Sequence, residues 1–239
     1  MTKLSVNINK VALIRNSRGA NYPDLVQIAR DCEKFGADGI TIHPRPDERH
    51  ARYADVPALK AMVKTELNVE GNPIPKFLKM VMKNRPHQCT LVPDAPDALT
   101  SDAGWDTLKH KDFLTDTIAA LKSKGIRTSI FINPDEKMIE GAKAVGTDRI
   151  EFYTGPYAHA YTKGRKKAVA DYARCGKLAH QLGLGINAGH DLNTNNLNYF
   201  IKKVGNVAEV SIGHALISDA LYYGLHHTIL MYLKECRNA

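Results

Sequence analysis

The residues most suited to chemistry lie between His43 and His50, an eight-residue segment with two histidines, two arginines and two acids. The segment follows Gly39–Ile42, a short run rich in β-branched residues that is typical of a fully buried strand. Histidine exchanges protons near neutral pH, and arginine matches the geometry of phosphate. Because α/β barrels carry reactive side chains on the loops that follow their strands, this segment predicts part of an active site.

Two glutamates lie in apolar surroundings. Glu70 ends the run Leu67–Val69, where partial loss of water raises a carboxyl pKa and suits it to proton transfer near neutral pH. The alternative is a salt bridge to an arginine or histidine of a neighbouring strand. Glu151 alternates with Ile150 and Phe152 and is expected to point into the barrel, where it stabilises a cationic intermediate or forms a buried structural pair.

Two further histidines follow apolar runs, His190 in Asn187–His190 and His214 in Ile212–Ala215. A single histidine after a strand is more often structural than catalytic. Together with His43, these two make three histidines at equivalent positions after strands, which favours a catalytic role. His190 is placed to donate or accept a proton.

Two segments indicate anion binding. Gly213 exposes backbone N–H groups at the start of a helix, which resembles the phosphate cradle of a barrel. Arg15–Gly19, after the first strand, offers an arginine fork for a second anion. Two such sites indicate either one bisphosphate or two monophosphate substrates.

The elements that must position these residues alternate along the whole chain. Eight strands each followed by a helix favour an α/β fold of the (β/α)₈ TIM-barrel type, with additional helices, as one catalytic domain over residues 1–239. The expected strands are Leu4–Ile8, Gly39–Ile42, Leu67–Val69, Gln88–Val92, Thr128–Ile132, Arg149–Tyr153, Gly185–Asn187 and Glu209–Ile212. The expected helices are Tyr22–Phe35, Val56–Lys64, Ile74–Lys83, Asp112–Lys124, Asp135–Val145, Lys163–Leu182, Asn195–Val204 and Asp219–Cys236.

The composition narrows the class of protein. The 239 residues suit one barrel, and no stretch is apolar enough for a signal peptide or a membrane span, so we expect a cytoplasmic protein without a membrane partner. The net charge of +8 is dispersed along predicted helices without interleaved aromatic residues, which favours a solvated surface that attracts small anions over nucleic-acid binding. The four cysteines have no C-x-x-C spacing and are expected to be buried thiols.

Metal catalysis is not expected. Asn7 and Asn9 stand where metal-dependent hydrolase barrels usually have two histidines, and Arg45 would repel a cation. None of the predicted strands contains an internal lysine for a Schiff base, although Lys10 lies just beyond the first.

The chain resembles the pyridoxine 5'-phosphate synthase family from about residue 4 to 236. The matching segments are Val6–Asn9, Arg15–Gly19, Gly36–His50, Leu67–Glu70, Leu91–Pro93, Ile150–Gly155, Asn187–His190 and Ile212–Ala215. The resemblance implies a transferase of vitamin B6 (pyridoxine) biosynthesis that condenses 1-deoxy-D-xylulose 5-phosphate with 3-amino-2-oxopropyl phosphate. The products are pyridoxine 5'-phosphate, phosphate and water. It also implies a homo-octamer that uses no cofactor and no metal.

The resemblance assigns roles by position. His43 and Glu70 would accept protons, His190 would donate one, and Glu151 would stabilise charge in the transition state. The implied substrate-binding residues are Asn7, Arg18, Gly213 and His214 for the aminoketone phosphate, and Asn9, Lys10, Arg45, His50 and Thr100 for the deoxyxylulose phosphate. Asp191, which follows His190, is a further substrate-binding candidate.

Three residues depart from the family pattern. Asn9 and Lys10 replace a common Asp-His pair; Lys10 is still suited to contact a phosphate or polarise a carbonyl, but Asn9 cannot act as a base. Asp191 stands where glycine is common, and either interacts with His190 or caps the next helix. Asp94–Asp106, rich in Asp, Ala and Pro, is the expected lid over the site.

Two other functions remain open from the residues alone. Another phosphosugar barrel, an isomerase or aldolase, would act on one sugar phosphate and need no amine. A catalytically silent barrel that binds RNA through its positive charge would show steeply salt-dependent affinity, unaffected by changes at His43 or Glu70.

Overall fold

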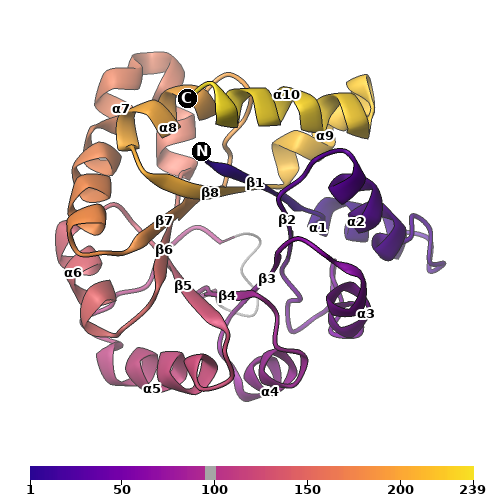
Figure 1. The fold of residues 1–239 in the computed structure, drawn as a ribbon, viewed down its shortest axis with the longest axis horizontal. Helices are drawn as coiled ribbons and strands as arrows, with labels where there is room; N and C mark the ends of the chain where they lie inside the picture. Colours follow the sequence, from indigo (N-terminus) through magenta and orange to yellow (C-terminus); the bar gives the residue numbers. More distant parts are fainter. Residues whose placement is uncertain (95–100) are drawn as a thin grey trace.

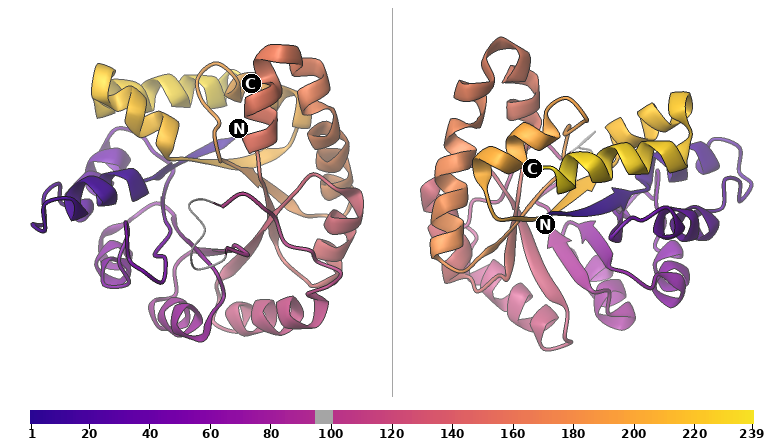
Figure 2. Two further views of the ribbon diagram at one scale, coloured as in Figure 1. Left: turned by 180° about the vertical axis from the view of Figure 1, so that it is seen from behind. Right: turned by 45° about the horizontal axis from the view of Figure 1, so that its top comes forward.

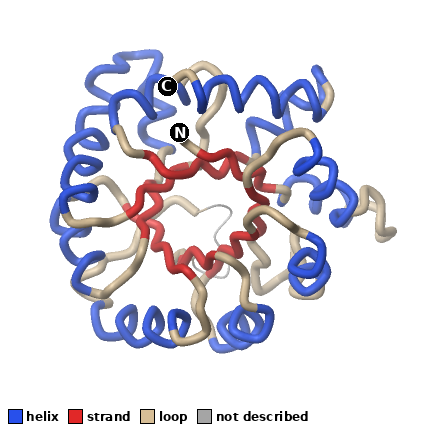
Figure 3. Tube along the Cα trace, in the orientation of Figure 1, coloured by secondary structure: helices blue, strands red, loops and turns tan. Residues whose placement is uncertain are grey.

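The computed structural model describes residues 1–94 and 101–239. Within these ranges, eight parallel strands pair in chain order and close into a barrel, with helices around the outside (Figures 1 and 3). This confirms the predicted (β/α)₈ barrel. The strands are β1 Lys3–Asn7, β2 Gly39–Ile42, β3 Leu67–Gly71, β4 Gln88–Leu91, β5 Arg127–Ile132, β6 Arg149–Phe152, β7 Gly185–Ala188 and β8 Val207–Ile212.

The strands are short and buried because each packs between the helices and the barrel interior. Leu4 and Val6 of β1 are fully buried apolar residues, whereas the alternate residue Ser5 shares a hydrogen bond with Thr41 Oγ1 at 2.7 Å. Asn68 extends this polar interior by donating to Thr41. The two faces of the strands therefore differ, apolar toward the helices and polar within the barrel.

The helices surround the barrel on all sides (Figures 1 and 2). Their bounds are α1 Asn9–Asn16, α2 Leu25–Lys34, α3 Asp55–Met62, α4 Pro75–Asn84, α5 Lys111–Lys122, α6 Glu136–Ala144, α7 Gly155–Gln181, α8 Leu197–Val204, α9 His214–Tyr223 and α10 Leu225–Arg237. Gly36, Gly125 and Gly183 have positive φ angles just beyond the ends of α2, α5 and α7, a conformation in which glycine commonly ends a helix.

Several predicted boundaries are wrong. The segment after β1 forms α1, where a loop was expected. The first predicted helix begins at Leu25, and Asp24 caps it by accepting a hydrogen bond from the Val26 N–H at 2.8 Å. The last predicted helix is two helices, because Gly224 ends α9 with a φ of 74°.

Helix α7 also differs from its prediction. It starts eight residues earlier than Lys163, at Gly155, with Pro156 in its first turn, where the missing N–H costs no hydrogen bond. The backbone departs from helical geometry at Gly164, which divides α7 into a short first part and a long second part. The first part supplies one of the additional helices.

Other expectations hold within the described ranges. Cys32, Cys89, Cys175 and Cys236 are buried and free, as expected. In residues 1–94 and 101–239, no helix has the length and hydropathy needed to cross a membrane.

Candidate active site

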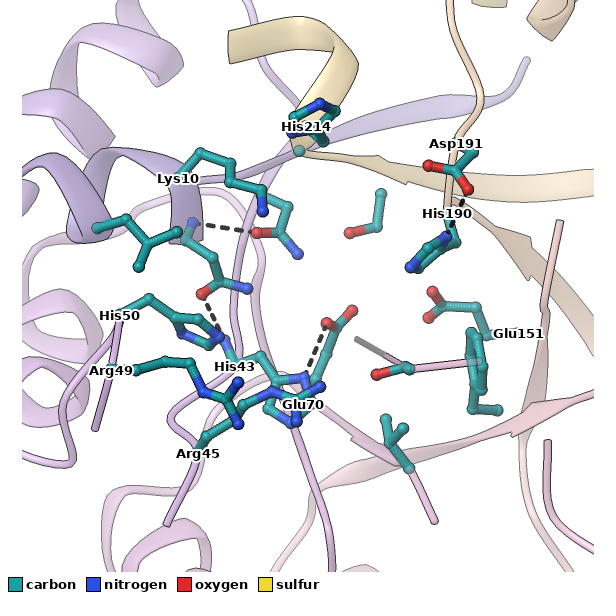
Figure 4. Close-up of a pocket in the computed structure, with 18 residues that line it drawn as sticks. Lys10, His43, Arg45, Arg49, His50, Glu70, Glu151, His190, Asp191 and His214 are labelled. Atoms are coloured by element: carbon teal, nitrogen blue, oxygen red, sulfur yellow. Dashed lines mark hydrogen bonds and ion pairs between the residues drawn. The ribbon is translucent and has the colours of Figure 1, made fainter. Parts of the chain in front are cut away.

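A cavity of about 570 Å³ opens at the carboxyl ends of the strands, where the sequence predicted the site. Figure 4 shows side chains from both halves of the chain converging on it. Twelve of the predicted residues line it: Asn7, Asn9, Lys10, His43, Arg45, His50, Glu70, Glu151, His190, Asp191, Gly213 and His214. Leu13, Arg49, Val92, Ser101, Phe131 and Ser211 also line it and were not predicted.

Two predicted residues do not appear in this lining. Arg18 is exposed beyond the end of α1. Thr100, with much of the expected lid, falls outside the described residues. Among the missed residues, Arg49 had a visible signal because it belongs to the segment His43–His50, whereas Leu13 and Val92 carry no sign of a site.

His43 follows β2 and is fixed by its neighbours. Its backbone N–H donates to Asn9 Oδ1 at 2.9 Å, so Asn9 positions the loop after β2. Its Nδ1 lies 4.0 Å from Glu70 Oε2, and its Nε2 lies 3.8 Å from Asp94 Oδ2. Burial, followed by the charge of Arg45, lowers the pKa of His43 well below its ordinary value. The imidazole is therefore neutral at neutral pH and able to accept a proton.

Asp94 is a further functional residue that sequence reasoning missed. Its Oδ2 accepts hydrogen bonds from Arg45 Nη2 at 2.7 Å and from Ser101 Oγ at 2.8 Å. Arg45 and Asp94 are both buried, so the ion pair fixes the guanidinium at the cavity wall. The composition of Asp94–Asp106 predicted a lid over the site but not this ion pair, since a partner 49 residues away leaves no local signal.

Glu70 and Glu151 enter the cavity from β3 and β6 (Figure 4). Burial, reinforced by the charge of Glu151, raises the pKa of Glu70 well above its ordinary value. Burial raises the pKa of Glu151 to about 7. Glu151 points inward as predicted, and its Oε2 has no hydrogen-bond partner among the described residues. Both carboxyls are thus suited to exchange protons near neutral pH.

His190 lies opposite His43 and Arg45, beside Glu151 and Asp191 (Figure 4). Its Nδ1 is 3.1 Å from Asp191 Oδ2, so the predicted contact between these two residues is confirmed. The Tyr153 ring meets the imidazole edge-on, with centroids 5.3 Å apart.

Gly189 allows two strands to lie close together. An added Cβ at this position would collide with the carbonyl oxygen of Ser211. Glycine is therefore required for β7 to approach β8.

The prediction that Arg15 binds an anion is wrong. Arg15 is buried, and its guanidinium forms two hydrogen bonds to Asp55, at 2.7 and 3.0 Å. Asn16 Nδ2 donates to the carbonyl oxygens of Glu48, Arg49 and His50, at 3.2, 3.0 and 2.8 Å. These two side chains of α1 hold the loop that carries His50 rather than a ligand.

The end of the cavity formed by Gly213 and His214 is suited to bind an anion. Gly213 precedes α9, whose first backbone N–H groups are oriented toward the cavity end of the helix, and His214 is its first residue. An added Cβ at Gly213 would lie 3.1 Å from the Cβ of Asn7, so β1 and the start of α9 are in close contact. Lys10 lines the same region.

A sequence model of the family described as "Pyridoxal phosphate biosynthesis protein PdxJ" matches residues 4–238. The chain belongs to the PdxJ family. A pyridoxine 5'-phosphate synthase from Christiangramia forsetii is 59% identical over 234 residues, which cover 98% of this chain and 99% of the relative. One from Bacteroides fragilis is 58% identical over 236 residues, which cover 99% of each chain. The PdxJ match thus spans nearly the whole barrel and every residue of the cavity lining.

Solved structures outside the PdxJ family share the fold. N-(5'-phosphoribosyl)anthranilate isomerase from Pyrococcus furiosus has a TM-score of 0.62 at 11% identity, covering all of both chains. Thiamine phosphate pyrophosphorylase from the same organism has a TM-score of 0.64 at 11% identity, covering 99% of this chain and 96% of that one. At this level of identity the likeness concerns the barrel alone.

Proposed function

We propose that this chain is a pyridoxine 5'-phosphate synthase, an enzyme that condenses 1-deoxy-D-xylulose 5-phosphate with 3-amino-2-oxopropyl phosphate. The products are pyridoxine 5'-phosphate, inorganic phosphate and water. One observation carries the proposal: twelve of the fourteen residues that the family resemblance implicates line one cavity, with acid–base groups on two opposite walls. The relatives that carry this enzyme name match nearly the full chain.

The acid–base groups divide into two sets. His43, neutral through its lowered pKa, and Glu70 lie on one side of the cavity, and His190 lies on the other. Imine formation, enolisation, loss of phosphate, ring closure and aromatisation require proton transfers at different substrate atoms. Two sets on opposite walls reach atoms that one acid–base pair cannot. We assign proton acceptance to His43 and Glu70, and proton donation to His190.

The carboxyls suit this chemistry. Because the pKa of Glu70 is raised, its ionised form is a stronger base than an ordinary carboxylate. Glu151 shares the cavity with Glu70, and its charge disfavours ionisation of Glu70. When ionised, Glu151 stabilises positive charge on a nitrogen-containing intermediate.

Two regions would bind the two phosphate substrates. Arg45, held by Asp94, and His50 would bind the deoxyxylulose phosphate together with Asn9, Lys10 and Thr100. Asn7, Gly213 and His214 would bind the aminoketone phosphate. The family resemblance adds Arg18 to this set, although Arg18 is not part of the cavity lining in this structure. The mechanism needs no metal or organic cofactor, since every step is a proton transfer, an addition or an elimination.

The deciding experiment is incubation of metal-stripped protein with both substrates. We expect pyridoxine 5'-phosphate, detected by absorbance and mass, only when both substrates are present, and formation that survives a chelator. Conversion of one sugar phosphate without the amine would instead favour an isomerase or aldolase. Salt-sensitive RNA binding without turnover would favour the silent barrel.

We further propose that the protein is a cytoplasmic homo-octamer. The support is the family resemblance together with exposed apolar side chains such as Leu221, Tyr222 and Tyr223 on α9. Light scattering should give about eight times the 26.5 kDa chain mass. A monomeric mass would contradict this assembly.

A further inference from the structure

Asp191 has an unusual backbone for a residue with a side chain. Its φ angle is 65°, in the left-handed region that L-residues other than Asn and Asp seldom adopt. Such conformations persist where the surrounding structure enforces them, and they concentrate at functional sites. The turn that contains Asp191 lies directly after His190 and at the wall of the cavity.

The turn is fastened on both sides of Asp191. The Thr154 hydroxyl donates to the His190 carbonyl oxygen at 2.5 Å, and the Leu192 N–H donates to the Gly189 carbonyl oxygen at 2.9 Å. Asn196 Nδ2 donates to the carbonyl oxygen of Asp191 itself at 3.4 Å. These bonds hold the backbone, so the direction in which the Cα–Cβ bond of Asp191 leaves the chain is set by the fold.

That direction brings the carboxylate to His190. Asp191 Oδ2 lies 3.1 Å from Nδ1, and this hydrogen bond is the largest cause of the lowered pKa of Asp191. Asp191 therefore remains an ionised acceptor at neutral pH, which makes Nδ1 the nitrogen that bears the proton. The ring is confined further by Tyr153, edge-on at 5.3 Å, and points toward the cavity beside Glu151 (Figure 4).

We propose that Asp191 is the positioning residue for His190: its carboxylate holds the proton on Nδ1 and aims Nε2 into the cavity, toward the reacting substrate. A carboxylate that orients an imidazole in this way is worth a large factor in turnover, because the wrong tautomer presents the wrong nitrogen to the substrate. The expected effect on turnover rests on the proposed function. The assignment of the His190 tautomer rests only on the geometry of His190 and Asp191.

Two variants separate this role from a structural one. Asp191→Gly removes the carboxylate and relieves the left-handed backbone. Asp191→Asn keeps the backbone preference, but its amide can donate to Nδ1 and stabilise the opposite tautomer. We expect Asp191→Asn, which favours the wrong tautomer, to lower kcat about 10- to 100-fold with little change in KM. Asp191→Gly leaves both tautomers accessible and should lower kcat less, with an unchanged or higher melting temperature.

The tautomer itself is measured without turnover. In ¹⁵N-histidine-labelled protein, the His190 ring resonances are assigned by comparison with a His190→Gln variant. They should show a protonated Nδ1 in the wild type and a protonated Nε2 in Asp191→Asn. Asn206→Gly is the matched control, because Asn206 also has a left-handed backbone, with a φ of 51°, and does not line the cavity. This variant should keep the wild-type kcat and tautomer.

The outcomes are distinct. Wild-type kcat in both Asp191 variants, or the same tautomer in wild type and Asp191→Asn, would overturn the inference. Absence of pyridoxine 5'-phosphate synthesis by the wild type would refute the proposed function instead, and the ring resonances would still decide the role of Asp191.

Discussion

Replacing Arg15 by methionine tests whether this arginine holds the fold or a ligand. Its side chain is 2% exposed, and Asp55, which accepts two hydrogen bonds from it, is 15% exposed. Removing one partner of a buried pair costs about 3–5 kcal/mol because the other charge stays buried. Asp55 keeps one hydrogen bond, from the Arg52 N–H at 2.7 Å, so we expect the lower end, about 3 kcal/mol.

Urea unfolding followed by circular dichroism measures this loss. With an m-value of about 3 kcal/mol/M, the midpoint of Arg15→Met should fall by about 1 M. Arg15→Met with Asp55→Leu removes both charges and should recover part of the loss. Arg18→Met is the control for stability, because Arg18 is exposed and should leave the midpoint unchanged.

Two results for Arg15→Met would contradict the structural role of Arg15. A midpoint shift below about 0.3 M, or about 1 kcal/mol, would show that the buried pair contributes little to stability. If Arg15→Met kept its stability but lost affinity for a phosphate substrate, Arg15 would be a ligand-binding residue after all.

Three further predictions concern the cavity. Glu70→Gln should lower turnover about 100-fold or more while calorimetry shows unchanged binding of the phosphate substrates; near wild-type turnover would make Glu70 structural. Burial raises the pKa of Glu151 from 4.5 to about 7, so between these pH values the folded protein retains a proton that the unfolded chain releases. Glu151 therefore lowers the free energy of unfolding as the pH rises through this range. The stability of Glu151→Gln relative to wild type should therefore increase from about pH 4.5 to 7 and then level off in urea titrations, and a constant difference would contradict the assignment. Gly189→Ala should cost about 1–3 kcal/mol and most activity, because its Cβ would collide with the Ser211 carbonyl, and wild-type stability would show that the strands have room.

The barrel and most of its site could be predicted because their signals are local. Each strand is a short apolar run, and the reactive residue follows it directly, as His43 follows Gly39–Ile42. Fold geometry then gathers these loops at one end without any need to know the contacts in advance. The same reasoning placed Glu151 inside the barrel from alternation alone.

The errors have two physical origins. Helix α1 lacks a capping side chain at Ile8, and the role of Arg15 depends on Asp55, 40 residues away, so neither was visible locally. Asp94 was missed for the same reason. The break between α9 and α10 was different, since Gly224 was a visible stop signal that the apolar periodicity on either side concealed.

The closure of the barrel has a consequence for when activity can arise. Strands β1 and β8, the first and last of the chain, pair at the seam with Leu4 opposite Val210. Such distant pairing forms slowly, because chain entropy is lost before the contacts are made. Asn7 and Gly213 meet at this seam, so the proposed phosphate-binding end of the cavity forms only when β1 and β8 pair. During refolding, phosphate binding should return after helix content, and a chain under synthesis gains its substrate site only once β8 has left the ribosome.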